Sequence, residues 1–505
     1  MGPGPLGARV AALCDEVAPR LGTDTRAQVG AVRRRLDEPL RVALAGRLKA
    51  GKSTLVNALI GRRVAPTEVG ECTRVVTQFR YGTTDRVDVV RRDGSRTSLP
   101  LDETGMIPQR LGVARAEISF VDVTLTSDRL RDLTVLDTPG LASTNTSVSA
   151  GAQRLLTGGS LGPLDDDVDD DSAGAISGAE AVVYVFTQSV RADDVRALEA
   201  FRSASARLSG NPVNSLGLFN KVDKLVGGGA DPWPTAEPLA ADQARVLRRM
   251  VADVVPVVGL LAETTEAGRL TAADCEALRV LAGLPAAERT VLLASVDLFT
   301  SRDCPVPRQR RERLLRLLDL YGVGFALAQL VAQPRLASGE LVRALHAASG
   351  FARLRHTLDQ AFRWRTDAIK AGWALSSLER LAGHTARAAD RELLRDAIER
   401  VLQQPEYHRL RLLEVAQLVS TGTVELPEPM EQELTRLALS TDARWILALP
   451  AAGPEQLASA ALEAAARWRV YAVAGASPAQ SRVAQVAHRG FYLLSQRVRA
   501  EGGVR

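Results

Sequence analysis

The chain has 505 residues, of which 46% are hydrophobic, and a formal net charge of +5. This length suits two or three packed domains, and the mild positive charge permits anionic lipid or RNA as a partner without requiring either. The sequence has no run of about eighteen uncharged apolar residues and no basic or apolar start, so we expect a cytoplasmic protein without a spanning helix or signal peptide. Its four cysteines lie far apart without C-x-x-C spacing, which predicts reduced thiols and no zinc site.

The first predicted element is a helix over residues 8–37, where apolar and charged residues alternate at helical spacing. It precedes the first predicted strand and must pack on something other than the sheet that follows. We therefore expect residues 1–38 to join the helices of the second half of the chain.

The next feature is a phosphate loop. Residues 46–53 read GRLKAGKS, the G-x-x-x-x-G-K-S pattern, between an apolar run at 42–45 and an amphipathic helix that begins near Lys52. The loop N–H groups and the positive helix end wrap a polyphosphate, the Lys52 ammonium reaches the β and γ phosphates, and the Ser53 hydroxyl ligates Mg²⁺. The chain is therefore predicted to bind a nucleoside triphosphate. The predicted phosphate-binding residues are Gly46, Lys49, Ala50, Gly51, Lys52, Ser53 and Thr54.

Residues near the phosphate loop are candidates for catalysis. Lys49 occupies the loop position nearest the γ-phosphate. Its positive charge there would stabilise the negative charge that develops during phosphoryl transfer. The alternative is that the Lys49 side chain points to solvent. Farther on, residues 68–77 form the candidate first switch, in which one threonine completes the Mg²⁺ shell and holds the attacking water. Thr73 is our first candidate for that role, and Thr67 is the second.

A second motif, D-x-x-G, follows the apolar β run at residues 133–136. Its Asp137 carboxylate approaches Mg²⁺ and the Gly140 N–H approaches the γ-phosphate, so the motif senses the third phosphate. The next residue is Leu141, where many regulatory nucleotide hydrolases have a glutamine that orients the attacking water. We therefore expect slow turnover by an isolated monomer and a second copy docking across the nucleotide face to complete the site.

The composition changes after this motif. Residues 143–178 are small, polar and acidic, and they include the run DDDVDDD at 165–171. Such a segment buries too little apolar surface to order itself, so we expect a solvated acidic insertion near 143–178. A repulsive effect on wrong partners or on a lipid surface is the alternative.

The third motif selects the base. The sequence N-K-x-D at residues 220–223 follows an apolar strand, and the Asp223 carboxylate accepts from guanine N1 and N2, whereas over adenine it would stay unpaired. Asn220 and Lys221 complete this reader, and Gly259 is a further candidate in a later loop that lacks a clear Ser-Ala-Lys sequence. Three motifs in the required order, each after an apolar strand, predict an α/β P-loop domain that binds GTP.

Beyond residue 262 the strand signals fade and leucines at helical spacing take over. We expect a GTPase domain over residues 39–335 with a helical insertion near 263–316, and an all-α neck and trunk bundle over 336–505. A single helix of about thirty residues, roughly 45 Å long, is predicted from Phe351 to Leu381. The segments that complete an antiparallel bundle with it are 409–419, 429–439, 454–473 and 478–498.

A membrane contact is predicted at a tip of this bundle. Residues 444–450 combine a basic residue, Trp445 and an aliphatic run, which suits shallow insertion into a membrane surface. A helix end buried in the bundle is the alternative interpretation. The turn at residues 383–387 is a second candidate tip.

The sequence resembles the bacterial dynamin-like GTPases, in particular the actinobacterial type that includes the mycobacterial isoniazid-induced proteins. The resemblance rests on residues 42–57, 66–67, 72–77 and 136–140, and it continues weakly through the helical remainder, for example at 349–351 and 370–371. It implies a GTPase head on a helical neck and trunk, a homodimer through the heads or pairing with a paralogous dynamin-like partner, and remodelling of membranes at the inner face of the cell membrane. Leu48 and Lys49 stand where the family has small or polar residues, so the family's mode of water positioning does not carry over.

The sequence thus predicts a Mg²⁺-dependent GTPase that hydrolyses GTP to GDP and phosphate. Through the resemblance, we expect this activity to be coupled to peripheral binding of anionic lipids and to tethering, fusion or fission of membranes. A ribosome- or RNA-associated GTPase is one alternative, but no RNA-binding module is evident in the second half, so nucleic acid is not an expected partner. A scaffold that uses GTP as an assembly switch is the other alternative.

Overall fold

The chain divides into two compact units, which we call the head and the helical unit. The computed structural model describes residues 4–47, 49–67, 75–138, 179–187, 195, 198, 214–227, 230–247, 250–362, 366–402, 404–420, 422–440, 442–474 and 476–502. The head comprises Pro39–Ala204 and Asn214–Trp364, and the helical unit comprises Met1–Glu38, Ser205–Val213 and Arg365–Arg505. An α/β head and a mostly helical remainder confirm the expected fold class.

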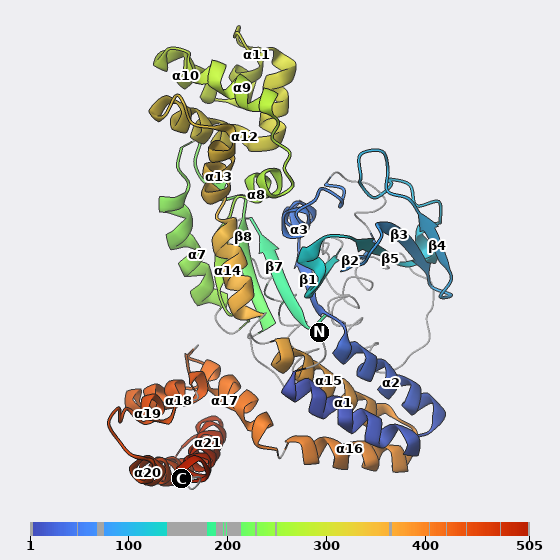
Figure 1. Ribbon diagram of the computed structural model, residues 1–505, viewed down its shortest axis with the longest axis vertical. Helices are drawn as coiled ribbons and strands as arrows, with labels where there is room; N and C mark the ends of the chain where they lie inside the picture. The colour runs from blue at the N-terminus through green and yellow to red at the C-terminus, as the bar shows by residue number, and fades with distance from the viewer. Residues whose placement is uncertain are drawn as a thin grey trace. The chain divides into compact units, whose positions relative to one another are not determined.

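A mixed sheet forms the centre of the head (Figure 1). Nine strands within the described residues pair in the order β4-β3-β5-β2-β6-β1-β7-β8-β9. The five strands from β6 to β9 in this order are all parallel, and β7 and β8 are buried along their whole length. Continuous apolar runs are typical of parallel strands that are covered on both faces. The strands are β1 Leu40–Gly46, β2 Thr77–Tyr81, β3 Arg86–Arg91, β4 Arg96–Leu99, β5 Ile118–Leu125, β6 Leu133–Asp137, β7 Ala181–Phe186, β8 Ser215–Asn220 and β9 Val254–Val257.

The order of these strands brings the three motifs together. β1 lies between β6 and β7, with Leu44 in register with Asp137, and β8 pairs with β7. Because the carboxyl ends of parallel strands meet at one edge of a sheet, the segments that follow β1, β6 and β8 meet there. These segments carry the phosphate loop, the D-x-x-G motif and the N-K-x-D motif.

Helices cover the sheet and extend the head. α3 lies beside α8, while α7 and α14 pack on β9. α9, α10 and α11 occupy the region of the helical insertion expected near residues 263–316. The helices are α3 Lys52–Ile60, α7 Trp233–Leu247, α8 Gly259–Glu266, α9 Ala272–Ala282, α10 Ala286–Leu293, α11 Val296–Ser301, α12 Arg308–Ala332, α13 Ser338–Ala348 and α14 Phe351–Ala361, with short 3₁₀ turns η3 Arg115–Glu117, η4 Asp128–Leu130 and η6 Val222–Lys224.

One helix among the described residues, α12, is long and apolar enough to cross a membrane by length and composition alone. Half of its most apolar window is buried inside the protein. Leu314, Leu317 and Leu318 have at most 1% of their surface exposed and belong to the core of the head. α12 therefore has the burial of a core helix.

The expected end of the head at residue 335 is wrong. α13 packs against α8 and α12, and its Leu341 and Leu345 are buried in the head core. The N–H of Val258, which follows β9, donates to the carbonyl oxygen of Ser349 over 2.9 Å. The head therefore includes α13 and α14, because their apolar faces are buried against elements of the head.

The single helix expected from Phe351 to Leu381 is also wrong. α14 ends at Ala361, and α15 (Thr366–His384) begins a second helix that belongs to the helical unit. The apolar positions continue at helical spacing through both helices. Those of α14 face the head, whereas those of α15 face α1 (Pro5–Val17), α2 (Thr23–Asp37) and α16 (Ala388–Leu402). The helical spacing of apolar residues in the sequence does not show that α14 packs on the head and α15 on the helical unit.

The first core of the helical unit combines the start of the chain with helices from its second half. α1 (Pro5–Val17) and α2 (Thr23–Asp37) replace the single N-terminal helix that we expected, and they pack with α15 and α16 (Ala388–Leu402). The Asp367 carboxylate accepts hydrogen bonds from the N–H groups of Leu6 and Gly7, each over 2.8 Å, and so caps the start of α1. Buried residues of this core include Val10, Leu13, Val17, Leu36, Leu375, Leu378 and Leu394.

The remaining helices form a second core in the helical unit. α20 (Pro454–Val473) and α21 (Pro478–Gly502) are joined by a short connection and pack along each other. Trp468 of α20 is fully buried in this core. Its Nε1 donates to Glu433 of α18 (Glu428–Leu439) over 3.1 Å. Each of the four segments expected after residue 408 lies inside one of these helices. The helices are α17 Pro405–Ser420, α18 Glu428–Leu439, α19 Ala443–Leu447, α20 Pro454–Val473 and α21 Pro478–Gly502.

The short helix α19 is the segment for which we weighed a membrane tip against a buried helix end. Ile446 is buried, whereas Trp445 is 49% exposed and Leu449 is 38% exposed. Ile446, with Ala443 and Leu447 packed beside it, therefore anchors the segment to the core, and two large apolar side chains point outward.

Candidate nucleotide site

The phosphate loop joins β1 to α3 by a turn that requires glycine at both ends. Gly46 has a φ of +143°, and a Cβ atom there would lie 2.2 Å from the carbonyl oxygen of Val185 on β7. Gly51 has a φ of +92°, and a Cβ atom there would lie 2.3 Å from Nδ2 of Asn220. The two glycines thus let the loop turn back on the sheet and start α3 with its N–H groups directed into the loop.

Lys52 is buried beneath this loop. Its Nζ donates to the carbonyl oxygens of Gly46 and Arg47 over 2.9 and 3.0 Å. Burial lowers the pKa of the Lys52 ammonium, and the nearby Asp137 carboxylate opposes this shift. The side chain is therefore held inside the loop that would surround a phosphate.

Ser53 and Asp137 lie at the adjacent ends of α3 and β6. The Ser53 hydroxyl donates to Oδ2 of Asp137 over 2.7 Å. Burial raises the pKa of Asp137, while the Lys52 ammonium and the Ser53 hydroxyl act in the opposite direction. Oδ1 of Asp137 is buried and has no hydrogen-bond partner among the described residues. A hydroxyl oxygen next to a carboxylate with a spare buried oxygen fits Mg²⁺, which prefers oxygen ligands.

The remaining positions of the loop differ in exposure. Ala50 is buried, Thr54 is partly buried in the first turn of α3, and Lys49 is exposed with a φ of +63°. A positive φ is unusual for a residue with a side chain and places Lys49 at the outer bend of the loop. Its side chain is therefore exposed at the outer surface of the loop.

Asn220 connects three loops of the site. Its Nδ2 donates to the carbonyl oxygen of Ala50 over 2.8 Å, while its Oδ1 accepts from the N–H groups of Gly259 over 3.0 Å and Lys221 over 2.8 Å. A Cβ atom on Gly259 would lie 2.7 Å from Oδ1 of Asn220. The structure thus brings together three predicted nucleotide residues that are far apart in the sequence.

The base-reading end of the site is centred on Asp223. Its side chain is only 7% exposed, and burial raises the pKa of its carboxyl group, with Lys224 opposing and Asp319 adding to the shift. Nζ of Lys224 lies 2.5 Å from Oδ2 of Asp319 and 4.0 Å from Oδ2 of Asp223. Lys221 has a φ of +60°, which turns the chain sharply between Asn220 and Asp223.

Sequence reasoning missed Lys224 and Asp319 as neighbours of the base reader. Asp319 lies in the middle of α12 with φ 54° and ψ −179°, an interruption of the helix that sequence periodicity does not reveal. Lys224 directly follows the N-K-x-D motif, but only the fold brings Asp319, 95 residues away, to it. Thr73, Gly140 and Leu141 lie outside the described residues, as does the acidic segment at 143–178.

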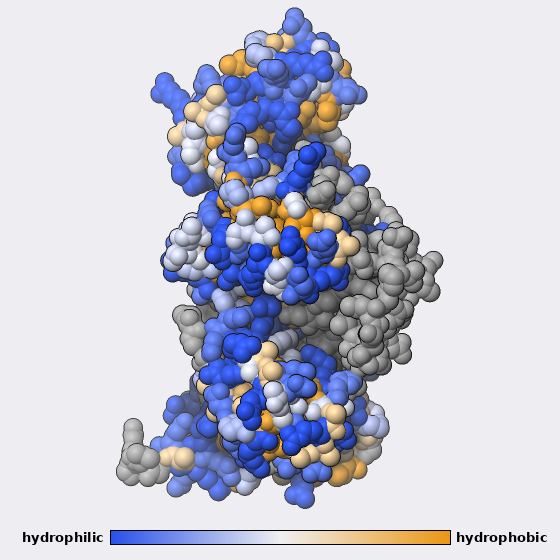
Figure 2. Space-filling model, turned by 90° about the vertical axis from the view of Figure 1, so that its right-hand side faces the viewer, coloured by the Kyte–Doolittle hydropathy of each residue, from blue (hydrophilic) through white to orange (hydrophobic). Residues whose placement is uncertain are grey.

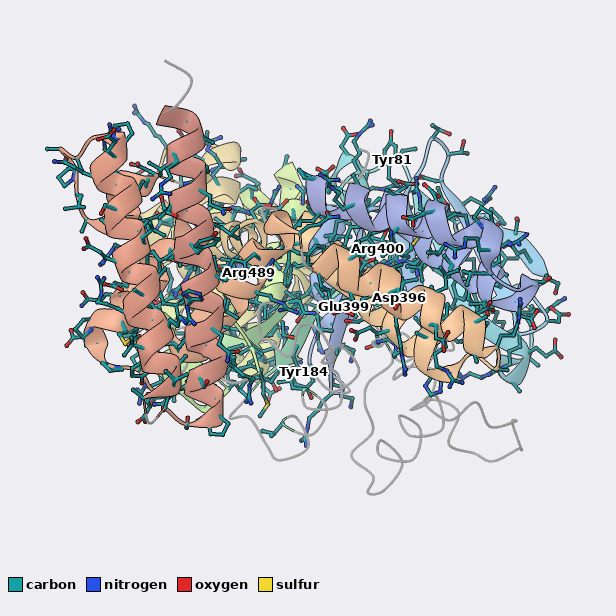
Figure 3. The ribbon with its side chains drawn as sticks, turned by 90° about the horizontal axis from the view of Figure 1, so that it is seen from below. Tyr81, Tyr184, Asp396, Glu399, Arg400 and Arg489 are labelled. Atoms are coloured by element: carbon teal, nitrogen blue, oxygen red, sulfur yellow. The ribbon has the colours of Figure 1, made fainter. Side chains whose placement is uncertain are left out.

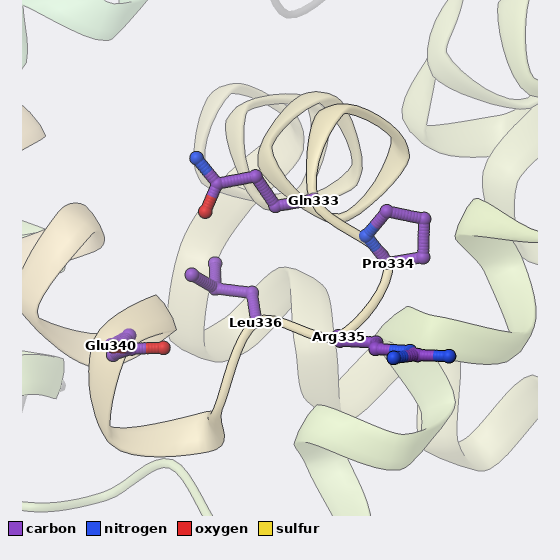
Figure 4. A pocket seen from close by; sticks show the side chains of 5 residues that line it. All are labelled: Gln333, Pro334, Arg335, Leu336 and Glu340. Carbon is purple, nitrogen blue, oxygen red and sulfur yellow. The ribbon is translucent and has the colours of Figure 1, made fainter.

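A separate depression of about 420 Å³ lies at the connection between α12 and α13 (Figure 4). None of the phosphate or base residues lines it. Glu340 in its wall accepts from the N–H of Ala337 over 3.0 Å and so caps α13. The depression is therefore distinct from the nucleotide site. Its lining residues are Gln333, Pro334, Arg335, Leu336 and Glu340.

The chain is similar to several known proteins. The sequence model of the dynamin family matches residues 42–209. The isoniazid-induced protein IniC of Mycobacterium tuberculosis is 34% identical over 456 residues, which are 88% of this chain and 87% of that protein. A bacterial dynamin-like protein of Nostoc punctiforme is 44% identical over 54 residues, which are 11% of this chain and 8% of that protein.

Among solved structures, a similar chain comes from an oligomerised bacterial dynamin pair described as a mechanism for the long-range sensing and tethering of membranes. It covers 98% of this chain and 90% of its own length, with 13% identity and a TM-score of 0.34. The similarity to IniC extends along nearly the whole of both chains, and it confirms the resemblance noted from the motifs. The chain therefore belongs to the dynamin family, among the bacterial dynamin-like proteins related to mycobacterial IniC.

Proposed function

We propose that this protein hydrolyses GTP to GDP and phosphate in the head. The observation that supports this most directly is the convergence of Lys52, Ser53 and Asp137 where β1 and β6 end, with one buried oxygen of Asp137 unpaired among the described residues. Membership of the dynamin family is in line with a GTPase.

Each residue of the phosphate site has a role in this proposal. Lys52 exchanges the loop carbonyls for the β and γ phosphates and neutralises their charge. Ser53, Asp137 and Thr73 would hold Mg²⁺, and the Gly140 N–H would sense the γ-phosphate. When bound, Mg²⁺ would neutralise charge on the phosphate oxygens. The loop N–H groups and α3 orient the phosphates for attack in line.

Guanine selection is assigned to Asp223, with Asn220 and Lys221 shaping the loop around it. A buried carboxylate that lacks partners over the wrong base discriminates strongly, because the unpaired charge is costly. Lys224 lies close enough to favour the charged form of Asp223, which is the form that accepts both guanine donors. Asn220 acts on the base indirectly, by holding the loops around it. Its Nδ2 donates to the carbonyl oxygen of Ala50, and its Oδ1 accepts from the N–H of Gly259.

Completion of the catalytic site is assigned to a second head. Leu141 follows D-x-x-G in place of a water-orienting glutamine, and Lys49 is exposed on the phosphate loop. We propose that heads pair across the nucleotide face, as a homodimer or with a paralogous dynamin-like partner. Lys49 then supports the charge that develops on the transferred phosphate.

The mechanical function proposed is peripheral membrane binding and remodelling at the cytoplasmic face of the cell membrane. It is supported by family membership and by the exposed Trp445 and Leu449 at α19. On the face displayed in Figure 2, hydrophobic residues form small patches among hydrophilic ones. A few apolar side chains together with basic residues suit binding to anionic lipids.

The assignment of activity is tested by GTP turnover of the full chain and of Lys52→Ala. The variant is expected to lose detectable GDP and GTP binding, because the phosphate charge is no longer neutralised. Lys370→Ala is the matched control, since Lys370 is also buried but belongs to the helical unit. Near-normal GTP affinity in Lys52→Ala would contradict the phosphate-loop assignment.

The alternatives are an RNA-associated GTPase and a GTP-switched scaffold. Cosedimentation with anionic liposomes and filter binding to RNA, each with GDP and with a non-hydrolysable GTP analogue, distinguish the first alternative from membrane binding. Binding to RNA but not to liposomes would support it. A protein that assembles with the GTP analogue but shows no turnover at any concentration would support the scaffold.

A further inference from the structure

Asn57, in the second turn of α3, is completely buried and fully hydrogen-bonded. Its Oδ1 accepts from the N–H groups of Val64 and Ala65 over 2.9 and 2.8 Å. Its Nδ2 donates to the carbonyl oxygen of Ala65 over 2.9 Å and to Oε1 of Glu263 over 2.8 Å. A side-chain amide has two donor hydrogens and two acceptor lone pairs, so all four are used.

Glu263 is a buried acid on α8, with 2% of its side chain exposed. Burial raises the pKa of its carboxyl group, while the Asn57 amide, Arg269 and Arg63 act against that shift. Nη1 of Arg269 lies 3.4 Å from Oε2, and Nε of Arg63 lies 3.9 Å from Oε1. Because a buried carboxylate is costly unless it is paired and hydrogen-bonded, this network fixes Glu263 in one position.

The two residues connect opposite ends of the nucleotide site. α8 begins at Gly259, whose N–H donates to Asn220 in the guanine loop, and Glu263 lies about one helical turn later. Asn57 holds Val64 and Ala65, and two residues separate Ala65 from the segment 68–77 that carries Thr73. A continuous path of buried contacts therefore runs from the guanine loop through α8 to the start of the first switch.

We propose that Glu263 is a positioning residue for the first switch, acting through Asn57 on Val64 and Ala65. This inference rests on the proposed binding of guanine nucleotide. Glu263 itself touches no nucleotide. Its function is to fix the position of Val64 and Ala65, from which the first switch extends to Mg²⁺ and the γ-phosphate. Because Glu263 lies on α8, this position is fixed relative to the loop that holds the base.

The consequence is specific to the triphosphate state. The first switch contacts Mg²⁺ and the γ-phosphate, so an error in its anchor weakens GTP binding and leaves GDP, held by the phosphate loop and base reader, nearly unaffected. A residue that only stabilises the head would change both affinities together. The ratio of the two affinities thus separates positioning from general support.

The test uses the full chain with Glu263→Met and Glu263→Gln. Methionine fills a similar volume but cannot accept from Asn57, whereas glutamine retains an acceptor oxygen. In Glu263→Met, affinity for a fluorescent non-hydrolysable GTP analogue with Mg²⁺ is expected to fall about ten-fold, while affinity for fluorescent GDP stays within about two-fold. Glu263→Gln is expected to bind both nucleotides like the wild type.

The matched control is Asp274→Asn, because Asp274 is another fully buried acid, which accepts from Arg310 and Arg313 in the helical insertion. It is expected to leave the ratio of the two affinities unchanged. Equal loss of both nucleotides in Glu263→Met, no loss of either, or failure of glutamine to restore binding would each overturn the proposal. A wild-type chain that binds neither nucleotide would instead overturn the proposed function.

A second measurement needs no variant. Hydrogen exchange at the N–H groups of Val64 and Ala65 is expected to slow about ten-fold when wild-type protein binds the non-hydrolysable GTP analogue with Mg²⁺, because the first switch is then held at the γ-phosphate. GDP lacks the γ-phosphate, so exchange at these two N–H groups is expected to change little in the GDP complex. Equal protection in the two complexes, or none in either, would overturn the proposal.

Discussion

Nδ2 of Asn220 lies 2.8 Å from the carbonyl oxygen of Ala50, so the guanine-side motif holds the phosphate loop directly. The same side chain accepts from Gly259 through its oxygen. A residue of the N-K-x-D sequence thus acts as a clamp between loops, and this role predicts an effect that is independent of the base.

Asn220→Ala is expected to weaken GDP binding by the wild-type chain and XDP binding by the Asp223→Asn chain by the same factor. The substitution leaves a buried carbonyl and a buried N–H without their partner, at a cost of about 2 kcal/mol, which corresponds to roughly thirty-fold in affinity. Equilibrium titration with both fluorescent nucleotides measures this effect. A loss confined to GDP would show that Asn220 reads the base instead of holding the loops.

Asp223→Asn is expected to change base preference. The amide of asparagine donates where the carboxylate accepted, so the variant should lose affinity for GTP and admit XTP. Competition between GTP and XTP in one turnover assay reports the preference, and the wild type is the reference. Retained preference for GTP over XTP would mean that another group reads guanine.

Specific GTPase activity is expected to rise with protein concentration, because paired heads complete each other's sites. Turnover across a dilution series that spans the dimerisation constant measures this effect. Constant specific activity across that series would argue against catalysis at a head interface.

Lys49→Ala is expected to lower kcat by about ten-fold or more and to change KM little, because Lys49 stabilises the charge that develops on the transferred phosphate. The same turnover assay measures both constants. Unchanged kcat and KM in Lys49→Ala would show that the side chain points to solvent.

His408 is expected to make the helical unit sensitive to mild acid. It is 5% exposed, and burial lowers its pKa to about 4, with Arg489 of α21 (Figure 3) and Arg411 of α17 adding to the shift and the Val486 carbonyl opposing it. The unfolded chain therefore binds a proton as pH falls below about 6.5, while the folded chain does not until about 4.

Stability is thus expected to decrease as pH falls from 6.5 to 4, by about 3 kcal/mol in total from this group. The melting temperature of His408→Gln should therefore fall less than that of the wild type as the pH is lowered over this range. His384→Gln, at an exposed position at the end of α15, is the control. An identical pH dependence of the melting temperature in His408→Gln and wild type would exclude His408 as the cause of the acid sensitivity.

Trp445→Glu is expected to reduce the salt-resistant part of binding to anionic liposomes. Electrostatic attraction weakens with salt, whereas an inserted apolar side chain continues to contribute. Cosedimentation at low and high salt measures both parts. Tyr492→Glu is the matched control, since Tyr492 is similarly exposed but lies on α21. Unchanged binding by folded Trp445→Glu would exclude α19 as the membrane contact.

The sequence was sufficient to place the phosphate loop beside Asp137 and Asn220. Each motif directly follows an apolar strand, and parallel strands end at a common edge, so local patterns were enough to infer their meeting. The fold class could be predicted for the same reason. The glycine requirements at Gly46 and Gly51 were part of the motif itself.

Other features depend on contacts that local patterns do not encode. Glu263 meets Asn57 across 206 positions, and Asp319 meets Lys224 across 95. Helical spacing likewise continues from α14 into α15, although the two helices bury their apolar sides in different units. Period and composition identify a buried face but not the partner against which it is buried.

The hydrogen bonds from Leu6 and Gly7 to Asp367 span about 360 positions, and this separation has a consequence for synthesis on the ribosome. At about 5–20 residues per second, α1 leaves the ribosome roughly 20–70 s before α15 is complete. During that interval its apolar stripe has none of its α15 and α16 partners, while the whole head emerges and can fold. Assembly of the first core of the helical unit therefore waits on the second half of the chain, and until then α1 and α2 are the segments that a chaperone would have to shield.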